Sequence, residues 1–294
     1  YRMTHKKYTR IIFALLFTMI WTAAASAVPL ASHVFIISYD GGAPYVMKDC
    51  DMPVLKGMLD QGACTWEAQT IFPSVTLIAH TSMMTGMGPA KHKVTWNGDE
   101  PDKKLEVTTC FAEARKKGLH TAFFPGKDKL LLIAIPDSMD HAECPGYESD
   151  KVAAAAAEYI VANKPNLTFV HFAETDGLGH KRGWGSDEQK AGFANADKAL
   201  GVLKEAVEKA GIADDSVFII TADHGGHKNT HGSNKPEDMT IPWILWGKNV
   251  KPGHTISEDV TVYDTAATAL WLLDVEIPES WDGKAITNAF NTPE

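Results

Sequence analysis

Apolar runs of strand length alternate with segments of helical spacing along most of this chain. The apolar runs that predict buried strands are His33–Tyr39, Leu119–Phe124, Leu167–Phe172, Val217–Thr221 and Ile241–Trp246. The segments that predict helices are Met52–Gln61, Ser149–Asn163, Ser186–Ala210 and Val262–Leu273. Strands separated by helices favour a parallel sheet that is covered on both faces. We therefore expect an α/β fold with a largely parallel central sheet and helices on both faces.

Two segments interrupt this alternation. Gly86–Asp102 is rich in Gly, Pro and Lys, which predicts an ordered loop over one end of the sheet. Pro125–Tyr147 is the better candidate for a small insertion. Neither is long enough to form a separate cap domain, so the expected fold is compact.

The first residues read as a secretion signal. Four basic residues and no acidic ones precede the apolar run Ile11–Trp21, and small residues ending at Ala27 follow it. We expect a signal peptide over residues 1–27 and one catalytic domain over residues 28–294, in a periplasmic or secreted protein. An uncleaved membrane anchor is the alternative, but the apolar run is marginal for a span of about 20 residues. No stable membrane anchor is expected.

Composition excludes several classes of protein. The chain has 294 residues, of which 45% are hydrophobic and 22% are charged, a balance typical of globular proteins. The net charge is −9, and it falls to −13 without the four basic residues of segment 1–27. Because broad nucleic-acid binding needs a basic face, no nucleic-acid partner is expected. A small phosphorylated substrate remains compatible if bound cations supply positive charge.

Four cysteines lie in the body of the chain, at Cys50, Cys64, Cys110 and Cys144. Export permits disulfide bonds, and four cysteines allow three pairings. Free thiols are the alternative, and the sequence does not choose among these.

Three acidic residues follow apolar strands. Asp40 ends the first run, Asp176 comes after Phe172 and a short turn, and Asp223 follows Ala222. One such acid is usually a helix cap. Three of them are harder to explain in that way. The carboxyl ends of parallel strands form the ligand-binding edge of an α/β sheet, so these three acids are candidates for a binding site.

Histidines accompany two of these acids. His180 lies four residues after Asp176, while His224, His227 and His231 follow Asp223 closely. A cluster of carboxylates and imidazoles without thiolates suits catalytic zinc, with manganese or iron as weaker options. The number of ligands fits two divalent metal ions about 3.5–4 Å apart.

A hydroxyl group lies near a predicted helix start. Pro73 and Ser74 break the chain, and a helix from about Thr76 to Thr85 follows. The start of a helix is a natural place for a phosphoryl group. Ser74 or Thr76 alone would be read as a helix cap, but a hydroxyl beside two metal ions becomes a candidate nucleophile.

Several ordered motifs resemble those of the alkaline phosphatase superfamily, and most closely its type I phosphodiesterase/nucleotide pyrophosphatase branch. The motifs are Ser38-Tyr39-Asp40-Gly41, Pro73-Ser74-Val75-Thr76 through His80 to Thr85-Gly86, Pro89-Ala90-Lys91-His92, Asp176 to His180, Thr221-Ala222-Asp223-His224-Gly225, Thr230-His231-Gly232, Ile241-Pro242 and Asp282-Gly283. The resemblance implies an alkaline-phosphatase-like fold and two zinc ions. One would be held by Asp40, Thr76, Asp223 and His224, and the other by Asp176, His180 and His231. Thr76 would be the nucleophile.

The sequence departs from this branch in places. The branch often has Asn three residues after the nucleophile, where Ala79 stands here. The metals, backbone N–H groups or another side chain such as Asn97 would then contact the phosphoryl group. His231 follows Asp223 without the long insertion of larger members, and His227 competes with it as a ligand. These departures concern the substrate more than the reaction type.

The resemblance implies hydrolysis of phosphate esters, with phosphodiester or nucleotide-type substrates first, through a covalent phosphothreonine. Phosphomonoesterase activity is an alternative within the same superfamily. Another arises from Lys127 and Lys129, because a similar lysine pair binds the substrate carboxylate in phosphonoacetate hydrolases. A sulfatase is disfavoured, since no C/S-x-P-x-R motif occurs in residues 72–80. A metal-binding domain without catalysis is the non-enzyme alternative, and the intact Thr76 argues against it.

Overall fold

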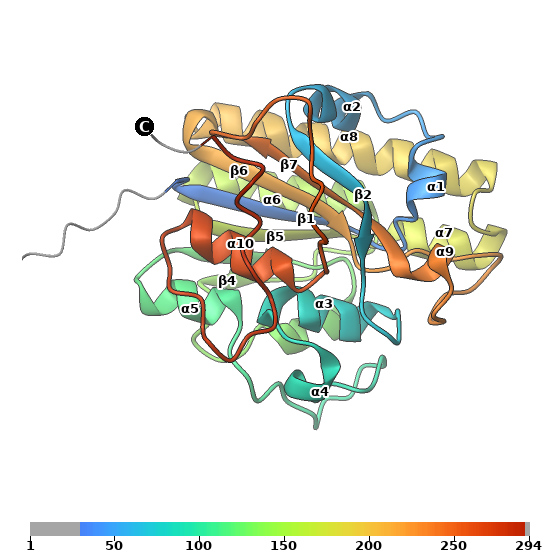
Figure 1. Ribbon diagram of the computed structural model, residues 1–294, viewed down its shortest axis with the longest axis horizontal. Coiled ribbons are helices and arrows are strands. Elements are labelled where there is room, and N and C mark those ends of the chain that lie inside the picture. The colour runs from blue at the N-terminus through green and yellow to red at the C-terminus, as the bar shows by residue number, and fades with distance from the viewer. Residues whose placement is uncertain (1–29, 292–294) are drawn as a thin grey trace, which may run out of the picture.

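The computed structural model describes residues 30–291, in which one eight-stranded sheet forms the centre of the molecule (Figure 1). The strands are β1 (His33–Tyr39), β2 (Ala63–Gln69), β3 (Thr121–Phe124), β4 (His141–Ala142), β5 (Leu167–Phe172), β6 (Ser216–Ala222), β7 (Thr240–Gly247) and β8 (His254–Thr255). Their order across the sheet is β4-β3-β5-β1-β6-β7-β2-β8. All neighbours pair in parallel except β7, which is antiparallel to both β6 and β2. The expected largely parallel α/β sheet is confirmed.

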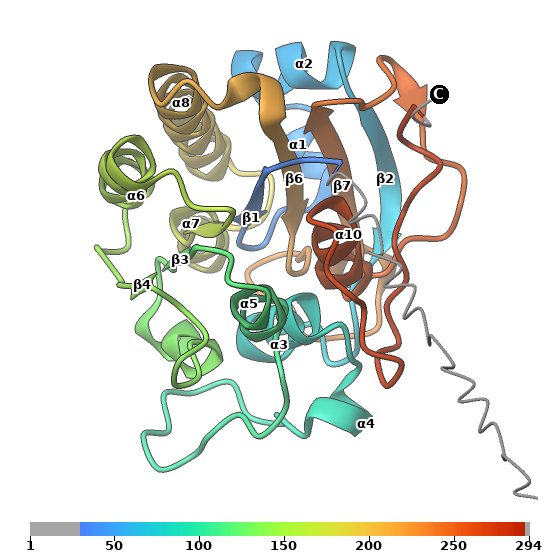
Figure 2. The ribbon, with the colours of Figure 1, turned by 90° about the vertical axis from the view of Figure 1, so that its left-hand side faces the viewer.

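Helices cover both faces of this sheet. They are α1 (Pro44–Met47), α2 (Pro53–Asp60), α3 (Thr76–Thr85), α4 (Pro89–His92), α5 (Cys110–Lys116), α6 (Ser149–Asn163), α7 (Glu174–Arg182), α8 (Asp187–Lys209), α9 (Pro236–Met239) and α10 (Asp264–Leu272), with 3-10 helices η1 (Asp128–Ile133) and η2 (Ala213–Asp215). Figure 2 shows α6 and α8 on one face, and α3, α5 and α10 on the other. The described residues contain no separate cap domain, as expected.

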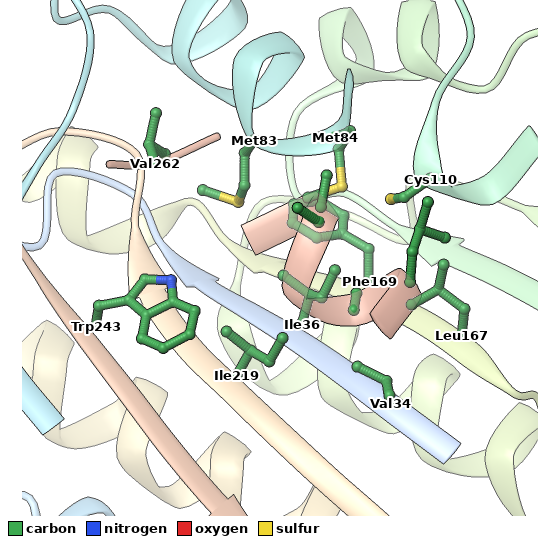
Figure 3. Close-up of a cluster of buried hydrophobic side chains, with 14 of the residues drawn as sticks. Val34, Ile36, Met83, Met84, Cys110, Leu167, Phe169, Ile219, Trp243 and Val262 are labelled. Atoms are coloured by element: carbon green, nitrogen blue, oxygen red, sulfur yellow. The ribbon is translucent and has the colours of Figure 1, made fainter. Parts of the chain in front are cut away.

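Alternation along the strands divides the core into two layers. In β1, Val34 and Ile36 pack towards α3, α5 and α10, whereas Phe35 and Ile37 pack towards α6 and α8. The first layer is drawn in Figure 3, where Met83 and Met84 of α3 lie against strand residues. Because all ten residues of α3 are buried, this helix is fixed along its whole length.

The structure settles several local features that the sequence left open. The N-cap of α6 is Glu148, and Ser149 and Asp150 are its first two residues. The cysteines form no disulfide, and Cys50, Cys64, Cys110 and Cys144 are free thiols. Pro125–Tyr147 folds as η1 and the short edge strand β4, and Gly86–Asp102 includes α4.

The proposed signal over residues 1–27 lies outside the described residues. Among the described helices, none combines the length and apolar character that crossing a membrane requires.

Candidate active site

Three carboxylates converge at the carboxyl ends of the adjacent strands β5, β1 and β6. Asp40 follows β1 and Asp223 follows β6, whereas Asp176 lies in the first turn of α7, directly after β5. All three side chains are buried. Asp223 is held by its Oδ1 atom, which accepts the backbone N–H groups of Gly41 at 3.1 Å and of His224 at 2.9 Å. Neighbouring parallel strands therefore bring together acids that lie far apart in the sequence.

Three histidines present the same ring nitrogen to these carboxylates. In each, Nδ1 lies within 2.9 Å of a backbone carbonyl oxygen, so Nδ1–H is the donor and Nε2 carries the free lone pair. The pairs are His180 with Asn229, His224 with Gly225, and His231 with Ser74. A backbone carbonyl that fixes the ring in this way is typical of histidines that bind metals through the other nitrogen.

The side chains form two overlapping groups of potential metal ligands. Their ligand atoms lie within 4.8 Å of one another in each group, which are Asp176, His180 and His231, and Asp40, Asp176 and His224. One oxygen of each buried carboxylate, namely Asp40 Oδ1, Asp176 Oδ1 and Asp223 Oδ2, has no hydrogen-bond partner. Buried carboxylate oxygens without partners are costly unless a cation contacts them. This donor set therefore fits divalent cations.

Burial shifts the acid–base properties of these groups. Burial raises the pKa of Asp223 well above its usual value, and the charge of Asp40 raises it further. Burial would also raise the pKa of Asp40, but the ammonium of Lys127 and the imidazole of His171 outweigh it, so this pKa lies well below the usual value. Burial and the neighbouring His231 lower the pKa of His224 to about 3. His224 is therefore a neutral base in a pocket that attracts positive charge.

Lys127 supplies positive charge to this pocket. Its Nζ atom lies 2.6 Å from Asp40 Oδ2 and 2.7 Å from Asp176 Oδ2. Burial lowers the pKa of Lys127, but the two carboxylates raise it by more, so the ammonium stays charged. The side chain reaches the carboxylates from the segment between β3 and η1, because β3 is the neighbour of β5.

Thr76 is the first residue of α3, and its hydroxyl faces the cluster. The Oγ1 atom lies 3.4 Å from His224 Nε2, and the residue is only 1% exposed. The N-cap is Val75, and neither Thr76 nor Ser74 caps the helix with its side chain. Ser74 instead donates its hydroxyl to the Ser233 carbonyl at 2.8 Å.

Asn97 and Lys129 lie at the same helix start. The Asn97 Oδ1 atom accepts the backbone N–H of Leu77 at 2.9 Å and the ammonium of Lys129 at 3.1 Å. Burial and the charge of Lys127 lower the pKa of Lys129. The side chains of Asn97 and Lys129 are therefore placed next to the residue that follows Thr76.

His227 lies apart from these groups. Its Nδ1 atom is 2.7 Å from Asp238 Oδ1, and Lys235 lies 3.1 Å from its Nε2. Both ring nitrogens are therefore engaged by residues of α9 and its N-cap. Of the two competing histidines, the structure brings only His231 to the carboxylates.

Two further histidines support the site: His80, which lies in one of the motifs but was given no role, and His171, which lies in none of them. His171 Nδ1 accepts the N–H of Gly126 at 3.0 Å, so its Nε2–H donates to Asp40 Oδ2 at 2.9 Å. His80 Nδ1–H donates to the Thr76 carbonyl, and its Nε2 lies 2.8 Å from the Ser38 hydroxyl. Their signal in the sequence is a histidine inside an apolar strand or a buried helix, where a polar partner is needed.

The fold and the convergent carboxylates and histidines define a protein of the alkaline phosphatase superfamily. Within it, the chain belongs to the type I phosphodiesterase/nucleotide pyrophosphatase family, which it matches over residues 34–240. It is similar to ectonucleotide pyrophosphatase/phosphodiesterase family member 7 of Mus musculus, with 23% identity over 216 residues, 65% of this chain and 49% of the relative. It is also 33% identical over 124 residues to a phosphopentomutase of Agathobacter rectalis, covering 41% of this chain and 29% of that relative. The chain thus spans half or less of the length of these curated relatives.

Solved structures share the fold across most of the chain. A murine ectonucleotide pyrophosphatase/phosphodiesterase 5, an inactive variant in complex with AMP, matches with a TM-score of 0.75 and 16% identity over 88% of this chain and 100% of that chain. A 2-O GAG sulfatase matches with a TM-score of 0.71 and 15% identity over 87% of this chain and 73% of that chain. At these identities the likeness establishes the fold alone.

Proposed function

We propose that this protein hydrolyses phosphate esters, with diesters of the nucleotide type as the preferred class, through a covalent phosphothreonine at Thr76. The observation that carries the proposal is the Thr76 hydroxyl, which lies 3.4 Å from His224 Nε2 at the start of a buried helix. Family membership supports it, as does the solved relative that is inactive as a threonine-to-alanine variant and was obtained with AMP.

The proposed ligand set divides the cluster between two divalent ions, zinc first among them. Asp40, Thr76, Asp223 and His224 would hold one ion, and Asp176, His180 and His231 the other. The unpartnered carboxylate oxygens and the uniform Nε2 orientation support cation binding by these residues. Their division between two ions rests on the family resemblance, since the ligand atom of Asp176 also lies close to those of Asp40 and His224. When bound, such ions would supply Lewis acidity that lowers the pKa of a hydroxyl or water and neutralises phosphoryl charge.

In the proposed reaction the residues of the chain bind, orient and react. Thr76 Oγ1 loses its proton to solvent and forms a bond to phosphorus. The bond from phosphorus to the leaving oxygen breaks, and this oxygen departs with the electron pair, takes a proton from solvent and leaves as an alcohol. Water then cleaves the bond between phosphorus and Oγ1, which regenerates the hydroxyl and releases the phosphorylated product. Since Oδ1 of Asn97 already accepts two hydrogen bonds, its amide NH2 group is the part left to donate to a phosphoryl oxygen.

Space for a leaving group lies beside this helix start. A cavity of about 460 Å³ is lined by Leu77, Trp96, Lys103, Lys129 and Leu132, among others. Its volume falls within the range of small-molecule pockets. Its lining mixes apolar and aromatic residues with the acids Asp99, Glu100 and Asp128, and it includes Leu77, the neighbour of Thr76. It is large enough for a bulky leaving group.

A second candidate is the hydrolysis of a carboxylated phosphonate such as phosphonoacetate. It is favoured by two lysines that reach the site. The ammonium of Lys127 contacts Asp40 and Asp176, and that of Lys129 donates to Asn97. Two ammonium groups near a reacting phosphorus would suit a substrate that carries its own carboxylate.

A substrate panel tests the proposal. Zinc-replete and chelated protein would be assayed with an aryl phosphodiester, an aryl phosphomonoester, phosphonoacetate and an aryl sulfate. We expect the highest kcat/KM for the diester, loss of turnover on chelation, and a phosphorylated Thr76 peptide in acid-quenched protein. A higher kcat/KM for the sulfate, or full turnover in chelator, would contradict the assignment. If phosphonoacetate gives the highest kcat/KM, the second candidate function is selected.

We also propose that the enzyme acts in the periplasm or outside the cell, on the basis of the basic, apolar and small-residue pattern in residues 1–27. N-terminal sequencing of protein from the native host should begin near Val28. Protein with residues 1–27 intact in the cytosol would contradict this.

A further inference from the structure

Trp184, which belongs to none of the motifs, lies next to the candidate metal cluster. It follows α7 and is only 8% exposed. Its indole Nε1–H donates to the carbonyl oxygen of Gly41 at 2.9 Å, and its backbone N–H donates to that of Lys228 at 2.6 Å. Trp184 thus connects the segment after β1, where Asp40 lies, with the loop that leads to His231.

The indole also packs against two segments that carry ligands. A Cβ atom placed on Gly179 would lie 2.8 Å from the ring, and one placed on Gly226 would lie closer still. Gly179 immediately precedes His180 in α7, and Gly226 lies two residues after His224. Only glycine lets these backbones approach the ring so closely, so the ring determines where both segments lie.

Two candidate ligands touch the same ring edge-on. The His180 and His231 rings lie 5.3 Å and 5.9 Å from Trp184 between centroids, at interplanar angles of 86° and 62°. Because Nε1 of Trp184 is engaged by Gly41, the indole has no further polar group to offer the site. Its contribution to the histidines is steric and aromatic.

We propose that Trp184 is a positioning residue for the divalent cations, and that it acts by fixing Asp40, His180, His224 and His231 in one arrangement. The inference rests on the proposed metal-dependent function. The ion held by Asp176, His180 and His231 depends on it most, because two of its three ligands touch the indole.

Metal affinity of the folded full chain tests this. Zinc binding would be measured by competition with a chromophoric chelator for wild type, Trp184→Phe and Trp184→Ala, alongside melting of the metal-free proteins. Loss of outer contacts to metal ligands typically weakens affinity by about 10–100-fold. We expect such a loss for one zinc equivalent in Trp184→Ala and a smaller loss in Trp184→Phe, measured well below the melting temperature.

Trp246→Ala is the matched control. Trp246 also packs against an aromatic ring, that of Phe218, and its Nε1–H donates to Gln61. It lies at the opposite end of β6 from the site. It should lower stability and leave zinc affinity unchanged. Lower melting temperatures with unchanged zinc affinity in both Trp184 variants would overturn the proposal. No zinc binding by wild type would instead contradict the proposed function.

A double-mutant cycle gives an independent check. Gly226→Ala alone should weaken zinc binding, because the added methyl group displaces the indole of Trp184. In a Trp184→Ala background the methyl group has room, so the added loss should be markedly smaller. Equal losses in both backgrounds would show that Gly226 acts without Trp184 and would overturn the proposal.

Discussion

The Nδ1–H of His231 donates to the carbonyl oxygen of Ser74 at 2.8 Å, and its Nε2 lies 3.6 Å from Asp176 Oδ1. This bond joins the loop after β6 to the segment before the candidate nucleophile. It also leaves Nε2 of His231 free to bind a cation.

Replacement of the two competing histidines should separate their roles. His231→Ala removes a ligand atom, so we expect zinc content to fall by about one equivalent and turnover to fall by orders of magnitude. His227→Ala breaks the bond to Asp238 at the far side of the loop and should retain both metal and most activity. Metal analysis by mass spectrometry, together with kcat/KM, checks both variants. Loss of metal only in His227→Ala would reverse the assignment.

Lys127 provides a test of the electrostatics of the metal-free site. Lys127→Met leaves Asp40 and Asp176 buried without their ammonium partner, and breaking a buried pair is destabilising by about 3–5 kcal/mol. We expect this loss in chelated protein and a much smaller one in zinc-replete protein, since divalent cations would neutralise the same carboxylates. Urea unfolding in both conditions measures it.

Lys91→Met is the control for that experiment. Lys91 pairs with Asp282 at the surface, where it is 46% exposed, so its removal should change the free energy of unfolding by about 1 kcal/mol or less. An equal loss for Lys127→Met with and without zinc would show that its role is structural only.

The limits of sequence reasoning are visible in particular elements. The sequence predicted β1, β5 and α6 with the observed bounds, because apolar or helix-favouring residues dominate each of them. It did not predict β2, where Thr65, Glu67 and Gln69 leave no continuous apolar run, or α7, whose two glycines disfavour a helix. Yet it is the α7 helix that places Asp176 and His180 on one face, one turn apart.

The candidate site, like the fold, was predicted only in part. The sequence predicted the acids and histidines after the strands, because a parallel sheet brings such positions to one edge. The contact of Lys127 with Asp176 and that of Trp184 with Gly226 depend on how segments far apart in the chain pack together. No local pattern contains that information. His171 was missed because it lies within the run that predicts a strand.

His92 predicts a pH dependence of stability away from the site. The N–H of Val94 donates to its Nδ1 at 3.1 Å, so its Nε2–H faces the Ser82 hydroxyl at 3.0 Å. Burial lowers the pKa of His92 from 6.5 to about 4. Between pH 4 and pH 6.5 the unfolded chain binds a proton at His92 that the folded protein does not bind. The contribution of neutral His92 to the free energy of unfolding is therefore fully present above about pH 6.5 and is lost as the pH falls towards 4.

The measurement compares metal-free wild type with His92→Gln. The difference between their unfolding free energies should shrink as the pH falls from 7 to 4, at up to about 1.4 kcal/mol per pH unit, because only wild type carries this titrating group. All other ionisable groups are common to both proteins. A difference that stays constant over this range would contradict the assignment of the neutral tautomer to His92.

Thr76 gives the decisive test of the proposed chemistry. It is the first residue of α3 and not its cap, so Thr76→Ala loses no capping bond and should cost about 1 kcal/mol, the value of one buried methyl group. If its hydroxyl is the nucleophile, the same change closes the covalent route, and turnover should fall by several orders of magnitude. Thr76→Ser keeps a hydroxyl and should retain measurable turnover. Ser74→Ala is the matched control, because it removes a neighbouring hydroxyl whose partner is the Ser233 carbonyl. Steady-state kinetics and thermal melts of the three variants decide between the roles. Near wild-type activity in Thr76→Ala, or abolition of turnover by Ser74→Ala alone, would remove Thr76 from the reaction.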